Sequence, residues 1–177
     1  MMAFDNFKVT PANAFAHAAA LEAAEKPALH NPLVLYGGHG VGKTHLLQAI
    51  RTRLQLQAKA PEKEVVYVTG AEFSRGLWDA MEGDTDRLEA YLQRYDQAKA
   101  LLFDDLQTLL CAKPDWLPET AAALIEILHE RKKQIVITAD RPPQELEKIW
   151  PKLLALLESG LAVELLPPEG CGETAAK

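Results

Sequence analysis

Leu33-Val34-Leu35-Tyr36-Gly37-Gly38-His39-Gly40-Val41-Gly42-Lys43-Thr44 joins an apolar run to a glycine-rich turn, and a helical segment from His45 to Ala58 follows. The turn has the spacing G-x-x-x-x-G-K-T, which marks a phosphate-binding P-loop when a strand precedes it and a helix follows it. Glycines let backbone N–H groups turn toward an anion, and the helix N-terminus adds a positive dipole. The stretch therefore predicts a nucleoside triphosphate site rather than a chance glycine-rich turn.

Both side chains and backbone of the predicted loop are expected to bind the nucleotide. The Lys43 ammonium is expected to reach the outer phosphates, and the Thr44 hydroxyl is expected to ligate Mg²⁺. The other predicted nucleotide-binding positions of the loop are Gly37, Gly38, Gly40, Val41, Gly42 and His45.

Composition indicates one ordinary globular domain. The chain has 177 residues, of which 48% are hydrophobic and 25% charged, and this length is too short for two domains of usual size. We expect a nucleotide-binding core over residues 1–168 and a polar tail over residues 169–177. The formal net charge of −6 argues against coating DNA by bulk electrostatics, so that any nucleic-acid contact has to be local.

The sequence predicts a cytoplasmic protein that does not associate with membranes. The N-terminus lacks the basic run and apolar core of a signal peptide, and the apolar segment 153–166 is too short and too interrupted to span a bilayer. Cys111 and Cys171 are far apart in the sequence, which favours free thiols in a reducing compartment. No histidine spacing indicates a metal site, so Mg²⁺ bound with the nucleotide is the one metal expected.

Apolar runs of strand length alternate with helical segments, which indicates a parallel sheet covered on both faces. The predicted fold class is α/β: a three-layer P-loop NTPase fold with five parallel strands. The expected strands are residues 33–36, 64–68, 100–103, 134–138 and 161–165. The expected helices cover residues 11–25 with Thr10 as the cap, 45–59, 71–81, 85–97 capped by Asp84, about 118–132, and a segment beginning at Pro142-Pro143; residues 107–117 are expected to form a loop.

Two aspartates end the third predicted strand, at the edge where parallel sheets place their ligand chemistry. A P-loop needs an acidic partner there to hold Mg²⁺ on the β- and γ-phosphates. We assign this metal-binding role to Asp104, and Asp105 is expected to orient or deprotonate the attacking water. The alternative for both residues is a simple strand-ending turn.

Thr138 and Asp140 lie at the end of the fourth predicted strand. If that strand lies between the P-loop strand and the aspartate strand, its end faces the γ-phosphate, and a polar side chain there senses the phosphate by a hydrogen bond. Asp140 also precedes Arg141-Pro142-Pro143, so it is equally suited to cap a helix. Both interpretations stay open from the sequence.

Several blocks of the chain, in this order and spacing, resemble the ATPase domain of the bacterial replication initiator DnaA. The resemblance runs from about Phe4 to Glu169. The blocks are Phe4-Asp5-Asn6-Phe7, Phe15-Ala16-His17-Ala18-Ala19-Ala20, Asn31-Pro32-Leu33, Tyr36-Gly37-Gly38 with its P-loop, Val65-Val66-Tyr67-Val68, Leu102-Phe103-Asp104-Asp105-Leu106-Gln107, Leu128-His129-Glu130, Lys133-Gln134-Ile135-Val136-Ile137 and Asp140-Arg141-Pro142-Pro143.

The resemblance implies an AAA+ fold and ATP or ADP as the nucleotide. It makes Lys43 and Thr44 the Walker A residues, Asp104 and Asp105 the Walker B pair, and Asp140 the sensor 1 residue. The segment 4–9 then lies beside the adenine, with Val9 as the expected base contact. The resemblance also makes residues 71–97 the insertion that family members use to stack into filaments.

Departures from the family narrow the expected function. Lys152 and Leu156 fall where the family carries arginines, the second of them the finger that reaches a neighbour's ATP. The chain also stops where the family continues into a lid and a helix-turn-helix domain. We therefore expect an ATP/ADP-binding protein of replication initiation or its control. It is expected to be at most a weak ATPase alone and to dock onto DnaA or another replisome AAA+ subunit.

Three alternatives stay open: a non-catalytic interaction module with a structural nucleotide, an adaptor resembling a helicase loader, and a fragment of a longer initiator. A local contact with single-stranded DNA also stays open, without any residue pattern that supports it.

Overall fold

Five parallel strands form one sheet at the centre of the molecule. The computed structural model describes residues 2–83, 85–146 and 149–167, and its strand order is β2-β3-β4-β1-β5. The α/β prediction with five parallel strands is confirmed, and the strand bounds differ from the expected ones by no more than one residue at either end. The strands are β1 (Leu33–Tyr36), β2 (Val65–Thr69), β3 (Ala100–Asp104), β4 (Gln134–Ala139) and β5 (Leu161–Glu164).

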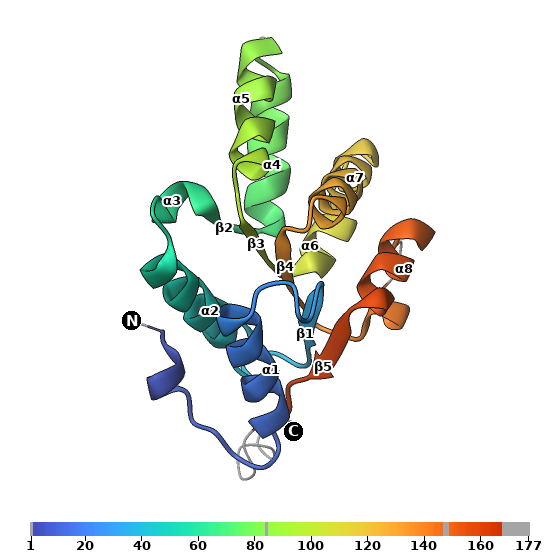
Figure 1. Cartoon of the computed structure of the whole chain (residues 1–177). Coiled ribbons are helices and arrows are strands. Elements are labelled where there is room, and N and C mark those ends of the chain that lie inside the picture. The colour runs from blue at the N-terminus through green and yellow to red at the C-terminus, as the bar shows by residue number, and fades with distance from the viewer. Residues whose placement is uncertain (1, 84, 147–148, 168–177) are drawn as a thin grey trace.

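Helices cover both faces of this sheet, which gives the three expected layers (Figure 1). Two helices, α1 and α2, pack on one face of the sheet. Four others, α4, α6, α7 and α8, pack on the opposite face, and α5 packs against α4. The helical segments are η1 (Phe4–Asn6), α1 (Ala14–Glu25), α2 (Lys43–Gln57), α3 (Pro61–Glu64), α4 (Gly70–Met81), α5 (Thr85–Asp96), α6 (Leu106–Leu110), α7 (Trp116–Glu130), η2 (Pro143–Glu145) and α8 (Pro151–Ser159).

The face under α1 and α2 is built from small and branched side chains. α1 buries alanines at helical spacing, which lets its backbone come close to its neighbours, and α2 turns one leucine- and isoleucine-rich side inward. The buried residues of the two helices are Ala16, Ala19, Ala20, Ala23, Ala24, Leu46, Leu47, Ala49, Ile50 and Leu54, together with Lys43.

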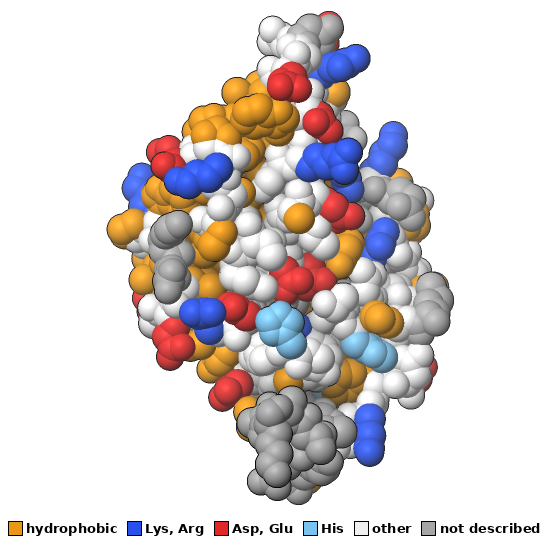
Figure 2. Space-filling model, turned by 180° about the vertical axis from the view of Figure 1, so that it is seen from behind, with side chains coloured by type: hydrophobic (Ala, Val, Ile, Leu, Met, Phe, Trp, Pro, Cys, Tyr) orange, Lys and Arg blue, Asp and Glu red, His pale blue; other side chains and the backbone are white. Residues whose placement is uncertain are grey.

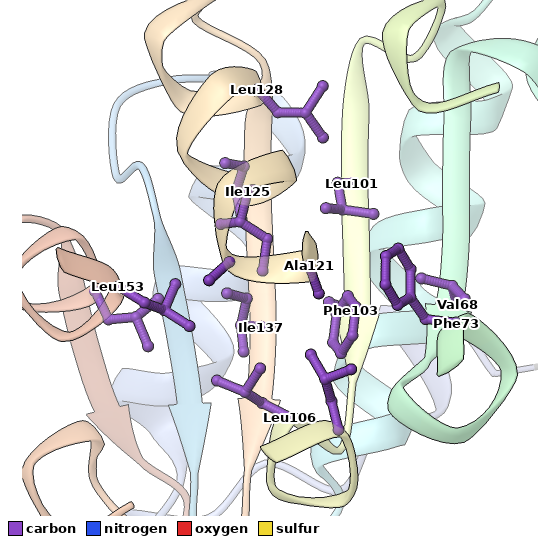
Figure 3. Packing of buried hydrophobic residues seen from close by; sticks show 14 of the residues in the cluster. Val68, Phe73, Leu101, Phe103, Leu106, Ala121, Ile125, Leu128, Ile137 and Leu153 are labelled. Atoms are coloured by element: carbon purple, nitrogen blue, oxygen red, sulfur yellow. The ribbon is translucent and has the colours of Figure 1, made fainter. Parts of the chain in front are cut away.

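The opposite face holds the larger apolar cluster, in which an aromatic group joins the α4–α5 hairpin to the sheet. Phe73 on α4 is 1% exposed, and its ring centroid lies 5.8 Å from that of Phe103 on β3 and 5.6 Å from that of Tyr95 on α5. Figure 3 shows Phe73 and Phe103 facing each other, beside side chains from α7. The predicted insertion, residues 71–97, is thus a helical hairpin anchored in the main core.

The strand register brings the predicted site residues to one edge of the sheet. Thr69 pairs with Asp104 across β2 and β3, and Tyr36 pairs with Ala139 across β1 and β4. β4 lies between β1 and β3, which is the arrangement on which the expectation for Thr138 and Asp140 depended. The P-loop, the aspartates and the end of β4 therefore share the carboxyl edge.

The loop expected over residues 107–117 is wrong. Residues 106–110 form α6, and α7 begins at Trp116, two residues before Pro118. A proline in the first helical turn costs no hydrogen bond, because the N–H groups there have no partner within the helix. α6 has only five residues and depends on packing rather than on propensity: Leu106, Leu109 and Leu110 are all buried.

The helix expected from Pro142-Pro143 is also wrong. Pro142 has an extended backbone with ψ of 154°, as a residue before proline usually does, and only the short η2 follows it. The next helix, α8, begins at Pro151, where the fixed φ of proline suits the first helical position.

The first helix begins later than expected. α1 begins at Ala14 instead of Pro11, so Thr10 is not its cap. Asn13 precedes the helix instead, and its side-chain oxygen accepts a hydrogen bond of 2.8 Å from the Thr10 N–H. Asp84, Cys171 and the expected tail 169–177 lie outside the described residues.

The base of the α4–α5 hairpin touches the segment that follows β3. Gly70 is the first residue of α4, and a Cβ there would lie 2.9 Å from the Asp105 carbonyl oxygen and 2.8 Å from the Leu109 nitrogen. Glycine therefore permits this close backbone approach between the hairpin and the predicted catalytic segment.

Within the described ranges, the helices are all too short or too polar to cross a bilayer.

Candidate nucleotide-binding site

The P-loop between β1 and α2 uses left-handed backbone at three glycines. Gly37, Gly40 and Gly42 have φ values of 144°, 73° and 108°, which side chains with a Cβ rarely adopt. A Cβ on Gly37 would lie 2.4 Å from the Leu165 carbonyl oxygen, so this glycine also lets the residue after β5 approach the loop. A Cβ on Gly38 or Gly40 would meet nothing within 4 Å, so the loop has open space on that side.

Lys43, in the first turn of α2, forms hydrogen bonds to the backbone of the P-loop. Its side chain is 8% exposed, and Nζ donates hydrogen bonds of 2.7 Å to the carbonyl oxygens of both Gly37 and Gly38. An ammonium has three donors, so one donor is left for an anion. The loop also stands at the N-terminus of a helix of fifteen residues. A cation, open glycine backbone and a helix dipole together fit a polyphosphate.

The N-terminal segment packs against the start of α2. The Nε2 atom of His45 lies 3.0 Å from the Ala3 carbonyl oxygen and 2.9 Å from Asn6 Oδ1. The Phe7 ring contacts His45 edge-on at 5.3 Å, and a Cβ on Gly42 would lie 2.9 Å from that ring. The segment is therefore held beside the P-loop.

Val9 continues this segment and is 49% exposed. Its expected contact with the adenine stays a prediction.

Asp104 is a buried carboxylate held from both neighbouring strands. It is 2% exposed. The Thr138 hydroxyl on β4 donates to Oδ1, and the Tyr67 hydroxyl on β2 donates to Oδ2 at 2.8 Å. These donors satisfy a charge whose burial without partners would be costly. Burial raises the pKa of the Tyr67 phenol well above its usual value, and the neighbouring Asp104 charge adds to this rise, so the hydroxyl stays a donor.

Asp105 has the left-handed φ of 57°, which aspartate tolerates better than most residues. Its N–H donates to the Thr138 hydroxyl oxygen at 2.8 Å, and its Oδ1 accepts a hydrogen bond of 3.0 Å from Gln107 Nε2. Such strained backbone is concentrated at functional sites. Thr138 thus joins the two aspartates, and a contact between this end of β4 and the γ-phosphate stays a prediction.

Asp140 pairs with its neighbour rather than with a helix. Arg141 donates to both carboxylate oxygens, from Nε at 3.1 Å and from Nη2 at 3.0 Å. These hydrogen bonds hold the pKa of Asp140 below its usual value against the opposing effect of burial, and the Lys43 charge contributes to the lowering. The cap interpretation is wrong, because Pro142 is the residue that precedes η2. The role of Asp140 as a γ-phosphate sensor stays a prediction.

The donor set at the carboxyl edge suits Mg²⁺. The Thr44 hydroxyl and the Asp104 carboxylate offer hard oxygen ligands, and Mg²⁺ typically takes one or two protein ligands plus phosphate oxygens and water. Among the described residues, no group of three or more histidine, cysteine or acidic side chains could hold a metal ion.

Sequence reasoning missed Tyr67 and Gln107 as parts of this site. Tyr67 was counted only as a strand residue, yet it lies on the same face of the sheet as Asp104 because it pairs with Leu102. A single tyrosine in an aliphatic strand was the available signal. Its meaning depends on the pairing of β2 with β3, which the sequence did not reveal.

The charges on the rear face of the molecule are mixed. Figure 2 shows acidic side chains beside a histidine near the centre of the rear face, whereas lysine and arginine side chains are scattered toward its margins. No continuous basic surface crosses the part of this face that the structure describes. Any polyanion longer than a nucleotide would therefore find few favourable charges there.

Comparison with known proteins agrees with this geometry. The family described as the bacterial DnaA ATPase domain matches residues 1–164. The chromosomal replication initiator protein DnaA of Thermotoga petrophila is 40% identical over 167 residues, which cover 94% of this chain and 37% of that protein. The chain thus spans little more than a third of the length of this relative.

Solved structures show the same likeness in space. Domain III of the Thermotoga maritima replication initiation protein DnaA matches with a TM-score of 0.85 and 38% identity, over 95% of this chain and 68% of that one. A replication initiator DnaA bound to AMPPCP and single-stranded DNA matches with a TM-score of 0.83 and 27% identity, over 93% and 49%. The fold is therefore that of the AAA+ ATPases, and the chain belongs to the bacterial DnaA ATPase domain family.

Proposed function

We propose that this chain binds ATP or ADP with Mg²⁺ at the carboxyl edge of its sheet, and that it acts in bacterial replication initiation or its control by docking onto another AAA+ subunit. The main support for this proposal is the position of the Lys43 ammonium in the loop. Lys43 is buried beside the N-terminus of α2 and bridges the Gly37 and Gly38 carbonyl oxygens. Binding of AMPPCP by a solved relative supports the choice of nucleotide.

Each site residue has a distinct part in this proposal. Thr44 and Asp104 hold Mg²⁺, which neutralises charge on the β- and γ-phosphates when bound. Asp105 orients or deprotonates the attacking water, with its carboxylate steadied by Gln107. Asp140 responds to the γ-phosphate, and Val9 contacts the base.

The chain is suited to receive an arginine finger but not to donate one. α8 reads PKLLALLES and contains no arginine. Leu156, at the finger position implied by the family resemblance, is partly buried and packs against the main core. An aliphatic side chain cannot stabilise charge in the transition state, a role worth about 10³–10⁵ in rate where a finger operates. This asymmetry fits a subunit at the end of an assembly, or a regulator of DnaA.

Hydrolysis at this site is expected to rise when a DnaA protein that carries the finger is added. The DnaA partner should carry a substitution of its own P-loop lysine, so that released phosphate reports on this chain alone. We expect phosphate release to increase by about 10-fold or more, because a finger from a neighbour supplies missing transition-state stabilisation. The measurement is single-turnover release of phosphate from ATP bound to this chain.

Two controls make that result specific. Asp105→Asn in this chain should return phosphate release to the level without DnaA, and so should removal of the finger arginine from DnaA. Release that DnaA does not stimulate would instead indicate a non-catalytic interaction module with a structural nucleotide.

Single-stranded DNA is a second candidate partner, because a solved relative binds it. In this chain one feature favours it. Trp78 on α4 is 41% exposed and stacks on Trp116 at the start of α7, with ring centroids 6.0 Å apart and planes 12° apart. Exposed aromatic rings offer a stacking surface for bases. The formal net charge of −6 opposes attraction of a polyanion, so we place the protein partner first.

A further inference from the structure

Tyr67 connects the edge strand of the sheet to the predicted metal-binding carboxylate. β2 is the outermost strand on its side, and among the residues that the structure describes it pairs only with β3. Tyr67 lies opposite Leu102, two residues before the end of each strand, and its hydroxyl reaches Asp104 Oδ2 at 2.8 Å. Both side chains are on the sheet face that α2 covers, since Val65 and Leu102 belong to that cluster.

Each carboxylate oxygen of Asp104 consequently accepts one hydrogen bond from a neighbouring strand. The Thr138 hydroxyl donates to Oδ1 from β4, and Tyr67 donates to Oδ2 from β2. With both oxygens held, the plane of the carboxylate cannot rotate freely about its side-chain bond. Each oxygen has about two lone-pair positions, so each keeps one for a ligand beyond the sheet edge.

Tyr67 is itself held in place. It is partly buried and packs against the α1–α2 cluster, and the Arg51 guanidinium carbon on α2 lies 5.5 Å from the centre of its ring. Arg51 is two turns along the helix from Thr44, the predicted hydroxyl ligand. The tyrosine therefore stands between the helix that carries one Mg²⁺ ligand and the strand that carries the other.

We propose that Tyr67 is a positioning residue of the nucleotide site, whose hydroxyl fixes the Asp104 carboxylate in the orientation that binds Mg²⁺ together with Thr44. This inference rests on the proposed function. Outer hydrogen-bond partners of metal ligands typically contribute about 10–100-fold to metal affinity. A purely structural tyrosine in an edge strand would have no such effect on the metal.

Tyr67→Phe tests this inference, because it removes one oxygen atom and keeps the ring. Nucleotide binding of the full chain is measured by calorimetry in EDTA and in excess Mg²⁺, and Mn²⁺ binding to the complex with ADP is measured by electron paramagnetic resonance. We expect unchanged affinity for metal-free ADP and Mn²⁺ affinity about 10-fold lower than in the wild type.

Tyr91→Phe is the matched control. Its hydroxyl also donates a hydrogen bond from a partly buried ring, to the Phe73 carbonyl oxygen at 2.9 Å, but it lies in the α4–α5 hairpin. This control should bind Mn²⁺ as the wild type does, and thermal unfolding should show that both variants are folded at the assay temperature.

Three outcomes would overturn the inference. Mn²⁺ affinity of Tyr67→Phe within about twofold of the wild type would show that the hydroxyl does not position Asp104, since an outer-sphere role predicts a larger loss. An equal loss of metal-free and metal-bound nucleotide affinity would show a structural role only. A wild-type chain that binds no nucleotide in either condition would remove the proposed function itself, together with the inference that rests on it.

Discussion

Lys43→Ala is expected to abolish measurable nucleotide binding. The substitution removes the cation that reaches the phosphates, and it also frees the Gly37 and Gly38 carbonyl oxygens that Nζ holds at 2.7 Å. Truncating one partner of a buried, charged contact costs about 2–5 kcal/mol in binding. The affinity for ATP should therefore fall by about 100-fold or more, as measured by calorimetry.

The loss has to be separated from a loss of folding and from a general effect of removing a positive charge. Lys26→Ala is the matched control, because Lys26 is exposed at the end of α1 and away from the loop. It should bind ATP with wild-type affinity. Circular dichroism should show the same helix content in both variants. If Lys43→Ala bound ATP as tightly as the wild type, the loop would not be the phosphate site.

Phe73→Ala is expected to be the most destabilising of the single substitutions considered. The Phe73 ring is 1% exposed and contacts Phe103 on β3 as well as Tyr91 and Tyr95 on α5. Replacing a buried phenylalanine by alanine costs about 3–5 kcal/mol through lost burial and the remaining cavity. Against a total stability of about 5–15 kcal/mol for a domain, this loss is large. The measurement is the free energy of unfolding in urea.

Met81→Ala serves as its control, because Met81 lies on the same helix and is 50% exposed. An exposed substitution should change the free energy of unfolding by about 0.5 kcal/mol or less. Since the ring joins the hairpin to the sheet, amide hydrogen exchange in Phe73→Ala should increase first in α4 and α5. A cost below about 1 kcal/mol for Phe73→Ala would mean that the hairpin does not depend on this contact.

The parts of the fold that the sequence predicted are those with strong local signals. The five strands are continuous apolar runs bounded by turn residues, and the P-loop motif has a fixed spacing that places a strand before it and a helix after it. Thr69 and Glu72 form a capping box at the start of α4: the Thr69 hydroxyl accepts from the Glu72 N–H at 3.1 Å, and Glu72 accepts from the Thr69 N–H at 3.0 Å. The spacing of a threonine and a glutamate three residues apart is itself a local signal for a helix start.

The errors lie where packing or proline chemistry overrides the local signal. α6 is too short to form alone, although its buried leucines at positions 106, 109 and 110 have helical spacing. Pro142 and Pro143 were expected to open a helix, but a residue before proline disfavours helical backbone. Pro143 opens only the short 3-10 segment η2, whereas Pro151, which no second proline follows, opens the α-helix α8.

For the candidate site, the sequence identified individual residues but not the contacts between them. The sequence identified Lys43, Thr44, Asp104 and Asp105 because each belongs to a motif. Thr138 and Tyr67 hold Asp104 from the two neighbouring strands, and those contacts depend on strand order and register. Thr138 on β4 is 34 positions after Asp104 in the chain, and Tyr67 on β2 is 37 positions before it. The three side chains therefore meet only after the sheet has formed.

A crystal structure of the chain grown with AMPPCP and Mg²⁺ tests the central claim most directly. We expect the phosphates to lie against Lys43 Nζ and the backbone N–H groups at the start of α2, with the metal between the Thr44 hydroxyl and the Asp104 carboxylate. A nucleotide bound anywhere else, or a P-loop that holds no ligand at a saturating concentration of AMPPCP, would contradict it.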